Sequence, residues 1–80
     1  MIIKVLGSGC ANCQKLDAIA HQATERLGIE AEFIKVTDFA EIMAYGVMST
    51  PALVVDEKLA LAGRVPSIDE VMAVLERAGA

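Results

Sequence analysis

The chain has 80 residues, of which 55% are hydrophobic, with no Trp and a formal net charge of −4 at pH 7. A chain of this length makes one domain, burying only about 60% of its unfolded surface, and we expect that domain to span residues 1–80 with an aliphatic core. An acidic chain without clustered Lys and Arg is not expected to bind nucleic acid or an anionic membrane. No apolar run approaches the roughly 18 residues of a membrane span. We expect a monomer.

The first part of the chain predicts a strand, a helix and a second strand. Apart from Lys4, residues 2–6 are apolar, rich in β-branched side chains and followed by a glycine, which is typical of a short buried strand. Apolar residues at helical spacing over 11–27 predict a helix, with Gly28 where a left-handed C-cap is expected. Residues 30–36 predict the second strand, which must run parallel to the first because a helix connects them.

The middle of the chain predicts a short helix and a β-hairpin. Asp38 with Glu41 three residues later forms the pattern of a capping box, and Gly46 ends the helix that it opens. Two apolar runs, at 52–55 and 59–62, are separated by charged residues that can turn, so they predict the two strands of a hairpin.

A last helix follows the hairpin. Ser67 and Glu70 form a second capping-box pattern, and Val71 and Leu75 lie on one face of the helix that they introduce. The predicted order is therefore β-α-β-α-β-β-α, an α/β fold in which helices cover the faces of the sheet.

The only two cysteines, Cys10 and Cys13, stand at the start of the predicted helix over 11–27. Free backbone N–H groups and the helix dipole stabilise negative charge there, so we expect a lowered pKa for the Cys10 thiol. Residues 7–9 (Gly-Ser-Gly) carry little bulk, which leaves Cys10 accessible. Cys13 can reach back to the first sulfur. The pair predicts a reversible disulfide and no other cofactor: Cys10 attacks a substrate disulfide and Cys13 resolves the mixed disulfide.

Two other interpretations of the cysteines stay open. They could pack as small hydrophobic residues, or they could bind a metal. A structural zinc ion wants four ligands, whereas this chain has two Cys and only His21, two to three turns along the helix. The alternative function is therefore a carrier of a soft ion such as Cu(I), held by two thiolates. Copper chaperone domains, however, have the order β-α-β-β-α-β, and they usually have Met where this chain has Ser8.

The start of the chain predicts a cytoplasmic protein. A secretory signal needs a basic start, a longer apolar stretch and a small-residue cleavage site, and residues 1–9 do not have this pattern. Thiols are kept reduced in the cytoplasm, and structural disulfides are rare there. Two cysteines in such a protein more often serve catalysis or metal binding.

Together these motifs give the chain a resemblance to a known family. A Cys-x-x-C at the start of the helix after the first strand, with "STPALVV" much later, resembles the thioredoxin fold. The whole chain is similar to its minimal core. With "GCANCQKL" and a "GR" after the last strand, it is most similar to small glutaredoxin-sized redox-active disulfide proteins. The resemblance implies a mixed four-stranded sheet flanked by three helices, and a thiol–disulfide oxidoreductase that reduces protein disulfides. It also implies an electron donor of the thioredoxin-reductase type.

The resemblance also implies roles for residues outside the Cys-x-x-C. Pro51 would be a cis-proline facing the disulfide, and Thr50 before it would offer backbone groups to an extended substrate segment. Gly63 would end the last strand and let the substrate approach. The sequence departs from thioredoxins at Lys4, where they carry a buried Asp that assists proton transfer at the second cysteine. The proton acceptor for Cys13 is therefore unassigned, and the glutathione-binding residues of glutaredoxins are missing.

Overall fold

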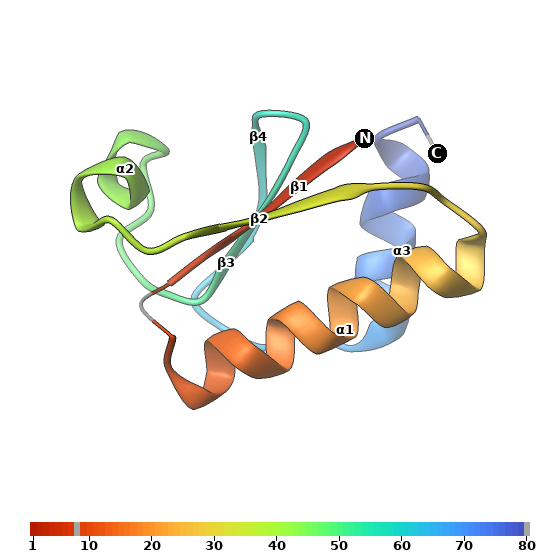
Figure 1. Cartoon of the computed structure of the whole chain (residues 1–80), viewed down its shortest axis with the longest axis horizontal. Helices are drawn as coiled ribbons and strands as arrows, with labels where there is room; N and C mark the ends of the chain where they lie inside the picture. Colours follow the sequence, from red (N-terminus) through yellow and green to blue (C-terminus); the bar gives the residue numbers. More distant parts are fainter. Residues whose placement is uncertain (8, 80) are drawn as a thin grey trace.

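The computed structural model describes residues 1–7 and 9–79. Its strands and helices follow the predicted order β-α-β-α-β-β-α. They are β1 (Ile2–Leu6), α1 (Ala11–Leu27), β2 (Glu32–Val36), α2 (Phe39–Ala44), β3 (Ala52–Val55), β4 (Lys58–Ala62) and α3 (Ile68–Arg77) (Figure 1). The predicted α/β fold class is confirmed, and the order differs from that of copper chaperone domains.

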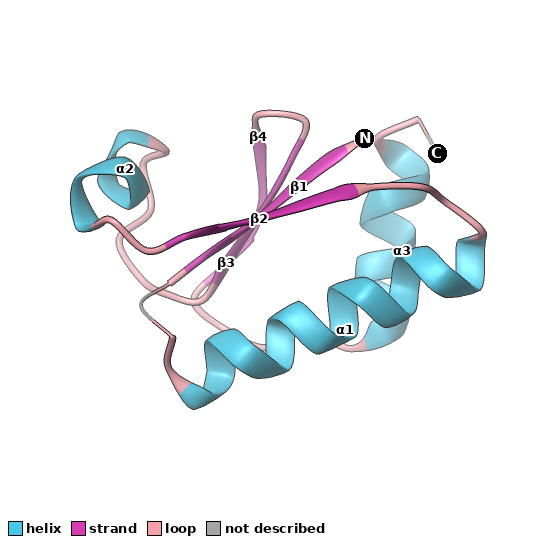
Figure 2. Cartoon of the chain, viewed as in Figure 1, coloured by secondary structure: helices cyan, strands magenta, loops and turns pink. Residues whose placement is uncertain are grey.

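The four strands form one mixed sheet in the order β2-β1-β3-β4 (Figure 2). β1 pairs parallel with β2, with Val5 opposite Lys35, as a strand–helix–strand crossover requires. β1 pairs antiparallel with β3, and β3 pairs antiparallel with β4. The sheet thus places the start of α1 beside the start of β3, because Leu6 at the end of β1 lies opposite Ala52.

Helices cover both faces of the sheet, so alternate residues of each central strand enter two different cores. Ile3 and Val5 pack on the side of α1 and α3, whereas Leu6 packs on the side of α2. Figure 1 shows α1 and α3 on one side of the sheet and α2 on the other. Every residue of β3 is buried, because β3 lies in the interior of the sheet and both of its faces are covered.

Two predicted strand boundaries were wrong by one or two residues. The second strand begins at Glu32 rather than at residue 30, because the chain is still leaving the left-handed cap at Gly28. Ile29 N–H there donates to the Thr24 carbonyl at 2.9 Å. The last strand begins at Lys58 rather than at residue 59, because Asp56 and Glu57, both with positive φ, complete the hairpin turn by themselves.

The two predicted capping boxes differ in the structure. The Ser67 hydroxyl accepts a hydrogen bond from Glu70 N–H, and the Glu70 carboxylate accepts one from Ser67 N–H, so this box is complete. Asp38 caps α2 by accepting a hydrogen bond from Ala40 N–H at 3.0 Å. Among the described residues, Glu41 makes no return bond to Asp38, so the expected box at α2 was wrong in its second half.

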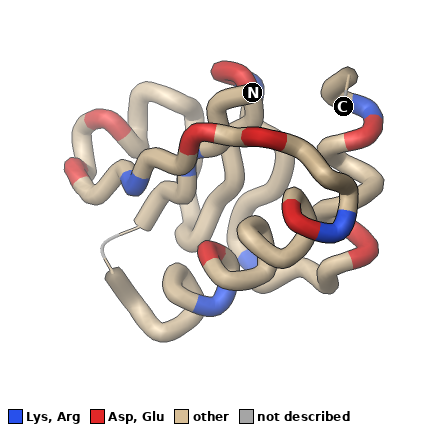
Figure 3. The backbone as a smooth tube through the Cα atoms, turned by 45° about the vertical axis from the view of Figure 1, so that its right-hand side comes forward, with Lys and Arg blue, Asp and Glu red and all other residues tan. Residues whose placement is uncertain are grey.

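Charged groups are scattered rather than gathered by sign. The tube in Figure 3 shows Lys and Arg on several elements, mostly with Asp or Glu nearby. The guanidinium of Arg64, for example, pairs with the Glu70 carboxylate through both terminal nitrogens. In the part of the chain that the structure describes, no helix has the length and apolar character to cross a membrane.

The Glu70 carboxylate generates a prediction about stability and pH. Its pKa is lowered to about 2, first by the Arg64 guanidinium and then by Ser67 N–H. A lowered pKa in the folded state adds stability above the ordinary value of 4.5, and this stability is lost as the pH falls toward about 2. The substitution Glu70→Gln should therefore lower the free energy of unfolding at neutral pH. This loss should become smaller as the pH falls from 4.5 to about 2.

Urea unfolding of both proteins over a series of pH values measures this effect. Arg64→Gln is the matched background, because removing the cation should remove most of the pH dependence of the Glu70→Gln effect. High salt should also weaken it, since the pair is exposed. A destabilisation by Glu70→Gln that stays constant over the whole pH range would contradict the assignment.

Candidate functional site

The two cysteines lie at the junction of β1 and α1, where the chain enters the first turn of the helix. Cys10 is the N-cap residue, with extended backbone angles, and its carbonyl accepts the first helical bond from Gln14 N–H at 3.0 Å. The Cys10 Sγ accepts a hydrogen bond from Cys13 N–H at 3.1 Å. The sulfur thus takes the place of the Ser or Asp oxygen that usually satisfies a free N–H at a helix start.

Cys10 and Cys13 are joined by a disulfide, with their Cα atoms 5.0 Å apart. The two ends of this bond differ in access to solvent. Cys10 is exposed, whereas Cys13 retains only 5% of its surface. An external thiol or disulfide can therefore reach the first sulfur, while the second sulfur is shielded by the protein itself.

Gly7 makes room for the buried sulfur. Its N–H donates to the Val36 carbonyl at 2.9 Å, which ties the end of β1 to the end of β2. A Cβ at position 7 would overlap the Cys13 Sγ and would lie 3.8 Å from the Thr50 Cβ. A side chain at this position would therefore displace the sulfur. The neighbouring Ser8, which the sequence contrasted with the Met of copper chaperones, lies outside the described residues.

The predicted substrate-positioning residues flank the β3–β4 hairpin: Thr50 and Pro51 come just before β3, and Gly63 comes just after β4. The Thr50–Pro51 peptide bond is cis, and Pro51 is buried at the start of β3. Gly63 N–H donates to the Pro51 carbonyl at 2.9 Å, so the end of β4 is fixed against this segment. Thr50 lies near the point where Gly7 meets Cys13, so the structure brings the 50–51 segment to the cysteines. Gly63 lies beside Ser49, and a Cβ at position 63 would be 3.5 Å from the Ser49 Cβ.

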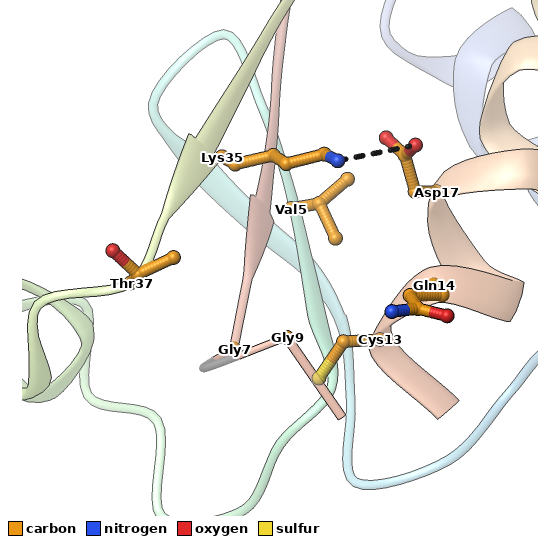
Figure 4. A pocket seen from close by; sticks show the side chains of 8 residues that line it. All are labelled: Val5, Gly7, Gly9, Cys13, Gln14, Asp17, Lys35 and Thr37. Carbon is orange, nitrogen blue, oxygen red and sulfur yellow. Dashed lines mark ion pairs between the residues drawn. The ribbon is translucent and has the colours of Figure 1, made fainter. Parts of the chain in front are cut away.

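A small cavity of about 50 Å³ lies beside the buried sulfur (Figure 4). Asp17, one turn beyond Cys13 on α1, lines the same cavity, and its Oδ2 lies 4.0 Å from the Nζ of Lys35 on β2. Sequence reasoning missed this pair of charged residues. The signal that could have found Asp17 is its spacing, since residues four apart share one face of a helix.

Lys4, at the position where thioredoxins carry an Asp, points to the other side of the sheet. Its side chain is 19% exposed and donates a hydrogen bond to the Tyr45 hydroxyl at 2.7 Å. It also pairs with the carboxylate of Glu57. The Glu57 carboxylate, and after it the Tyr45 hydroxyl, raise the pKa of Lys4 above its ordinary value. Lys4 therefore stays protonated at neutral pH and acts as a bridge between β1, α2 and the hairpin turn.

The single histidine, His21, contacts an aromatic ring and one carboxylate rather than a set of metal ligands. The ring of His21 stacks on Phe33 with 3.7 Å between centroids, and its Nε2 lies 3.5 Å from the Asp17 Oδ1. About half of the His21 side chain is covered. In residues 1–7 and 9–79, no three His, Cys, Asp or Glu side chains gather into a set that could hold a metal ion.

Comparisons with known structures place this fold among thioredoxins. Thioredoxin 1 of Thermosipho africanus superposes with a TM-score of 0.64, covering 98% of this chain and 93% of its own, at 22% identity. A malarial protein superposes with a TM-score of 0.68, covering 99% of this chain and 97% of its own, at 14% identity. At these identities the similarity concerns the fold alone.

Comparisons of sequence show the family as well as the fold. A thioredoxin of Methanothermobacter thermautotrophicus is 43% identical over 75 residues, which are 94% of this chain and 97% of that protein. A thioredoxin of Methanocaldococcus jannaschii is 37% identical over 71 residues, which are 89% of this chain and 81% of that protein. The family model of the thioredoxin domain matches residues 1–76. The chain therefore belongs to the thioredoxin family and is a thiol–disulfide oxidoreductase.

Proposed function

We propose that this protein reduces disulfide bonds in other proteins, with Cys10 as the nucleophile and Cys13 as the resolving thiol. The observation that carries the proposal is the asymmetry of the pair. Cys10 is exposed, and its Sγ accepts a hydrogen bond from Cys13 N–H. Cys13 is buried, and its Sγ forms the disulfide bond with Cys10. The positive end of α1 and the N–H donor both favour a thiolate at Cys10, which is the form that attacks a disulfide.

The reaction proceeds in two exchanges. The Cys10 thiolate attacks one sulfur of the substrate disulfide, forms a mixed disulfide and releases the other substrate sulfur as a thiolate. Cys13 then loses its proton and attacks the Cys10 Sγ. This step forms the Cys10–Cys13 disulfide and releases the second substrate thiolate. Two electrons pass from the protein to the substrate, and the released thiolates take up protons from solvent.

The segment at Thr50 and Pro51 would hold the substrate chain against the disulfide. Its position supports this role, because Thr50 lies beside Gly7 and Cys13 at the start of β3. Gly63, bonded through its N–H to the Pro51 carbonyl, would keep the neighbouring surface free of a side chain. We propose that an extended substrate segment lies along these residues.

An open apolar hollow beside Thr50 favours a protein as the substrate. Its rim carries Phe39 and Met48, which expose 74% and 87% of their surface, and its floor is formed by Ile42 and Val47. Large exposed apolar side chains grouped in this way are typical of surfaces that bind another protein. A small disulfide at Cys10 would leave this hollow empty.

The cellular setting completes the proposal. We propose that residues 1–80 act as one domain and that the protein works in the cytoplasm. Thiols are kept reduced there, so the cysteine pair would return to the dithiol form after each reaction. A reductase of the thioredoxin-reductase type would return the Cys10–Cys13 disulfide to the dithiol. Each turnover then transfers two electrons from that reductase to a disulfide-containing protein.

Cysteine variants test the assigned roles. Cys10→Ser should lower the reduction of a disulfide-bonded protein, with dithiothreitol as electron donor, to the uncatalysed rate, because no accessible nucleophile remains. Cys13→Ser should also stop turnover but accumulate the mixed disulfide at Cys10, which intact-mass measurement detects as an adduct. Turnover that survives the loss of Cys10, or an adduct that forms on Cys13 in the Cys10→Ser protein, would refute the assignment.

Variants of the hollow test whether the substrate is a protein. Met48→Ser and Phe39→Ser should each raise KM for a protein disulfide by about tenfold, equivalent to about 1.4 kcal/mol of lost contact. The rate with a small disulfide should stay unchanged. Leu59→Ser is the matched control, since Leu59 is an exposed apolar residue on β4 outside the hollow. Equal effects on protein and small disulfides, or an equal effect of Leu59→Ser, would argue against docking in the hollow.

A further inference from the structure

The second exchange requires a proton to leave a buried group. Cys13 retains 5% of its surface, and a thiol in such surroundings gives up its proton reluctantly because the thiolate loses its hydration. Lys4 cannot accept this proton, since it is cationic and faces the α2 side of the sheet with Tyr45 and Glu57. The reaction therefore needs another base close to the Cys13 sulfur.

Asp17 is a carboxylate with an unused buried oxygen. Its side chain is 21% exposed, and its Oδ1 is buried without a hydrogen-bond partner among the described residues. Among the described residues, two basic groups lie within 4.0 Å of the Asp17 carboxylate: His21 Nε2, at 3.5 Å from Oδ1, and Lys35 Nζ, at 4.0 Å from Oδ2. A buried carboxylate oxygen without a hydrogen-bond partner from the protein is available to accept a hydrogen bond or a proton from water.

The cavity connects this carboxylate with the cysteine. Asp17 and Cys13 are four residues apart on α1, so both project from the same face of the helix. Figure 4 shows them on one side of the cavity, with Val5 of β1 and Lys35 of β2 facing them. The cavity volume of about 50 Å³ is enough for water, which needs roughly 10–15 Å³ of such space. A proton can thus pass from sulfur to carboxylate through water, without direct contact.

We propose that Asp17 accepts the proton of Cys13 through this cavity, and that Lys35 holds the carboxylate in place. The inference rests on the proposed function, because it concerns the step in which Cys13 resolves the mixed disulfide. The Cys13 S–H proton passes to the Asp17 carboxylate as the Cys13 sulfur bonds to the Cys10 Sγ. The bond between Cys10 and the substrate sulfur breaks, and the departing thiolate receives a proton from Asp17 or from solvent.

The test separates the two exchanges in time. Reduced protein is mixed with dithiobis(nitrobenzoate), which releases one coloured thiolate when Cys10 attacks and a second when Cys13 resolves the mixed disulfide. The two phases are recorded over a series of pH values for the wild type and for Asp17→Asn, which keeps the shape of the side chain. Glu25→Gln, an equal charge change at the exposed far end of α1, is the control.

Asp17→Asn should leave the first phase unchanged and slow the second phase by at least about tenfold near neutral pH, within the roughly 10²–10⁴-fold that a positioned base supplies. The difference should narrow at high pH, where hydroxide can take the proton. An unchanged far-UV circular dichroism spectrum shows that the variant is folded. The inference is overturned if the second phase keeps the wild-type rate and pH profile, or if Glu25→Gln slows it equally. Absence of any second phase in the wild type would instead overturn the proposed function.

Discussion

The hydrogen bond from Cys13 N–H to the Cys10 Sγ depends on the way in which β1 feeds into α1. At that junction the first turn of the helix offers free N–H groups, and the N-cap residue supplies a sulfur where most helices supply an oxygen. The same turn directs the second sulfur inward, into the space that Gly7 leaves open. One local arrangement thus places an accessible sulfur beside the free N–H groups of the first turn and a shielded sulfur within bonding reach of it.

The rest of the fold holds this junction against the neighbouring strand ends. Parallel pairing with β2 anchors Gly7 to Val36, and antiparallel pairing with β3 brings Thr50 to the same place. Helices on both faces bury the central strands, so the strand ends at the cysteines are held by the cores of the whole molecule. In the proposed function, a substrate chain would lie between these strand ends and the apolar hollow at Phe39 and Met48.

The element order, the parallel direction of β1 and β2 and the place of the cysteines could be predicted from the sequence, because periodicity, glycines and caps are local signals. The relation of Asp17 to Lys35 could not, since it depends on a parallel register that sets Lys35 opposite Val5. The approach of Thr50 to Gly7 depends in the same way on the antiparallel register of β3. The stacking of His21 on Phe33 also requires knowledge of how α1 lies across the sheet.

The midpoint potential of the Cys10–Cys13 couple tests the account most directly. Purified protein would be equilibrated in thiol–disulfide buffers, and the oxidised fraction would be read by alkylation and intact mass. The account predicts a fully reversible two-electron couple with a midpoint near roughly −270 mV or lower, as for a thioredoxin-like reductant. A midpoint at roughly −120 to −180 mV, typical of an oxidant or isomerase, would contradict it. So would a protein that carries bound metal and forms no intramolecular disulfide.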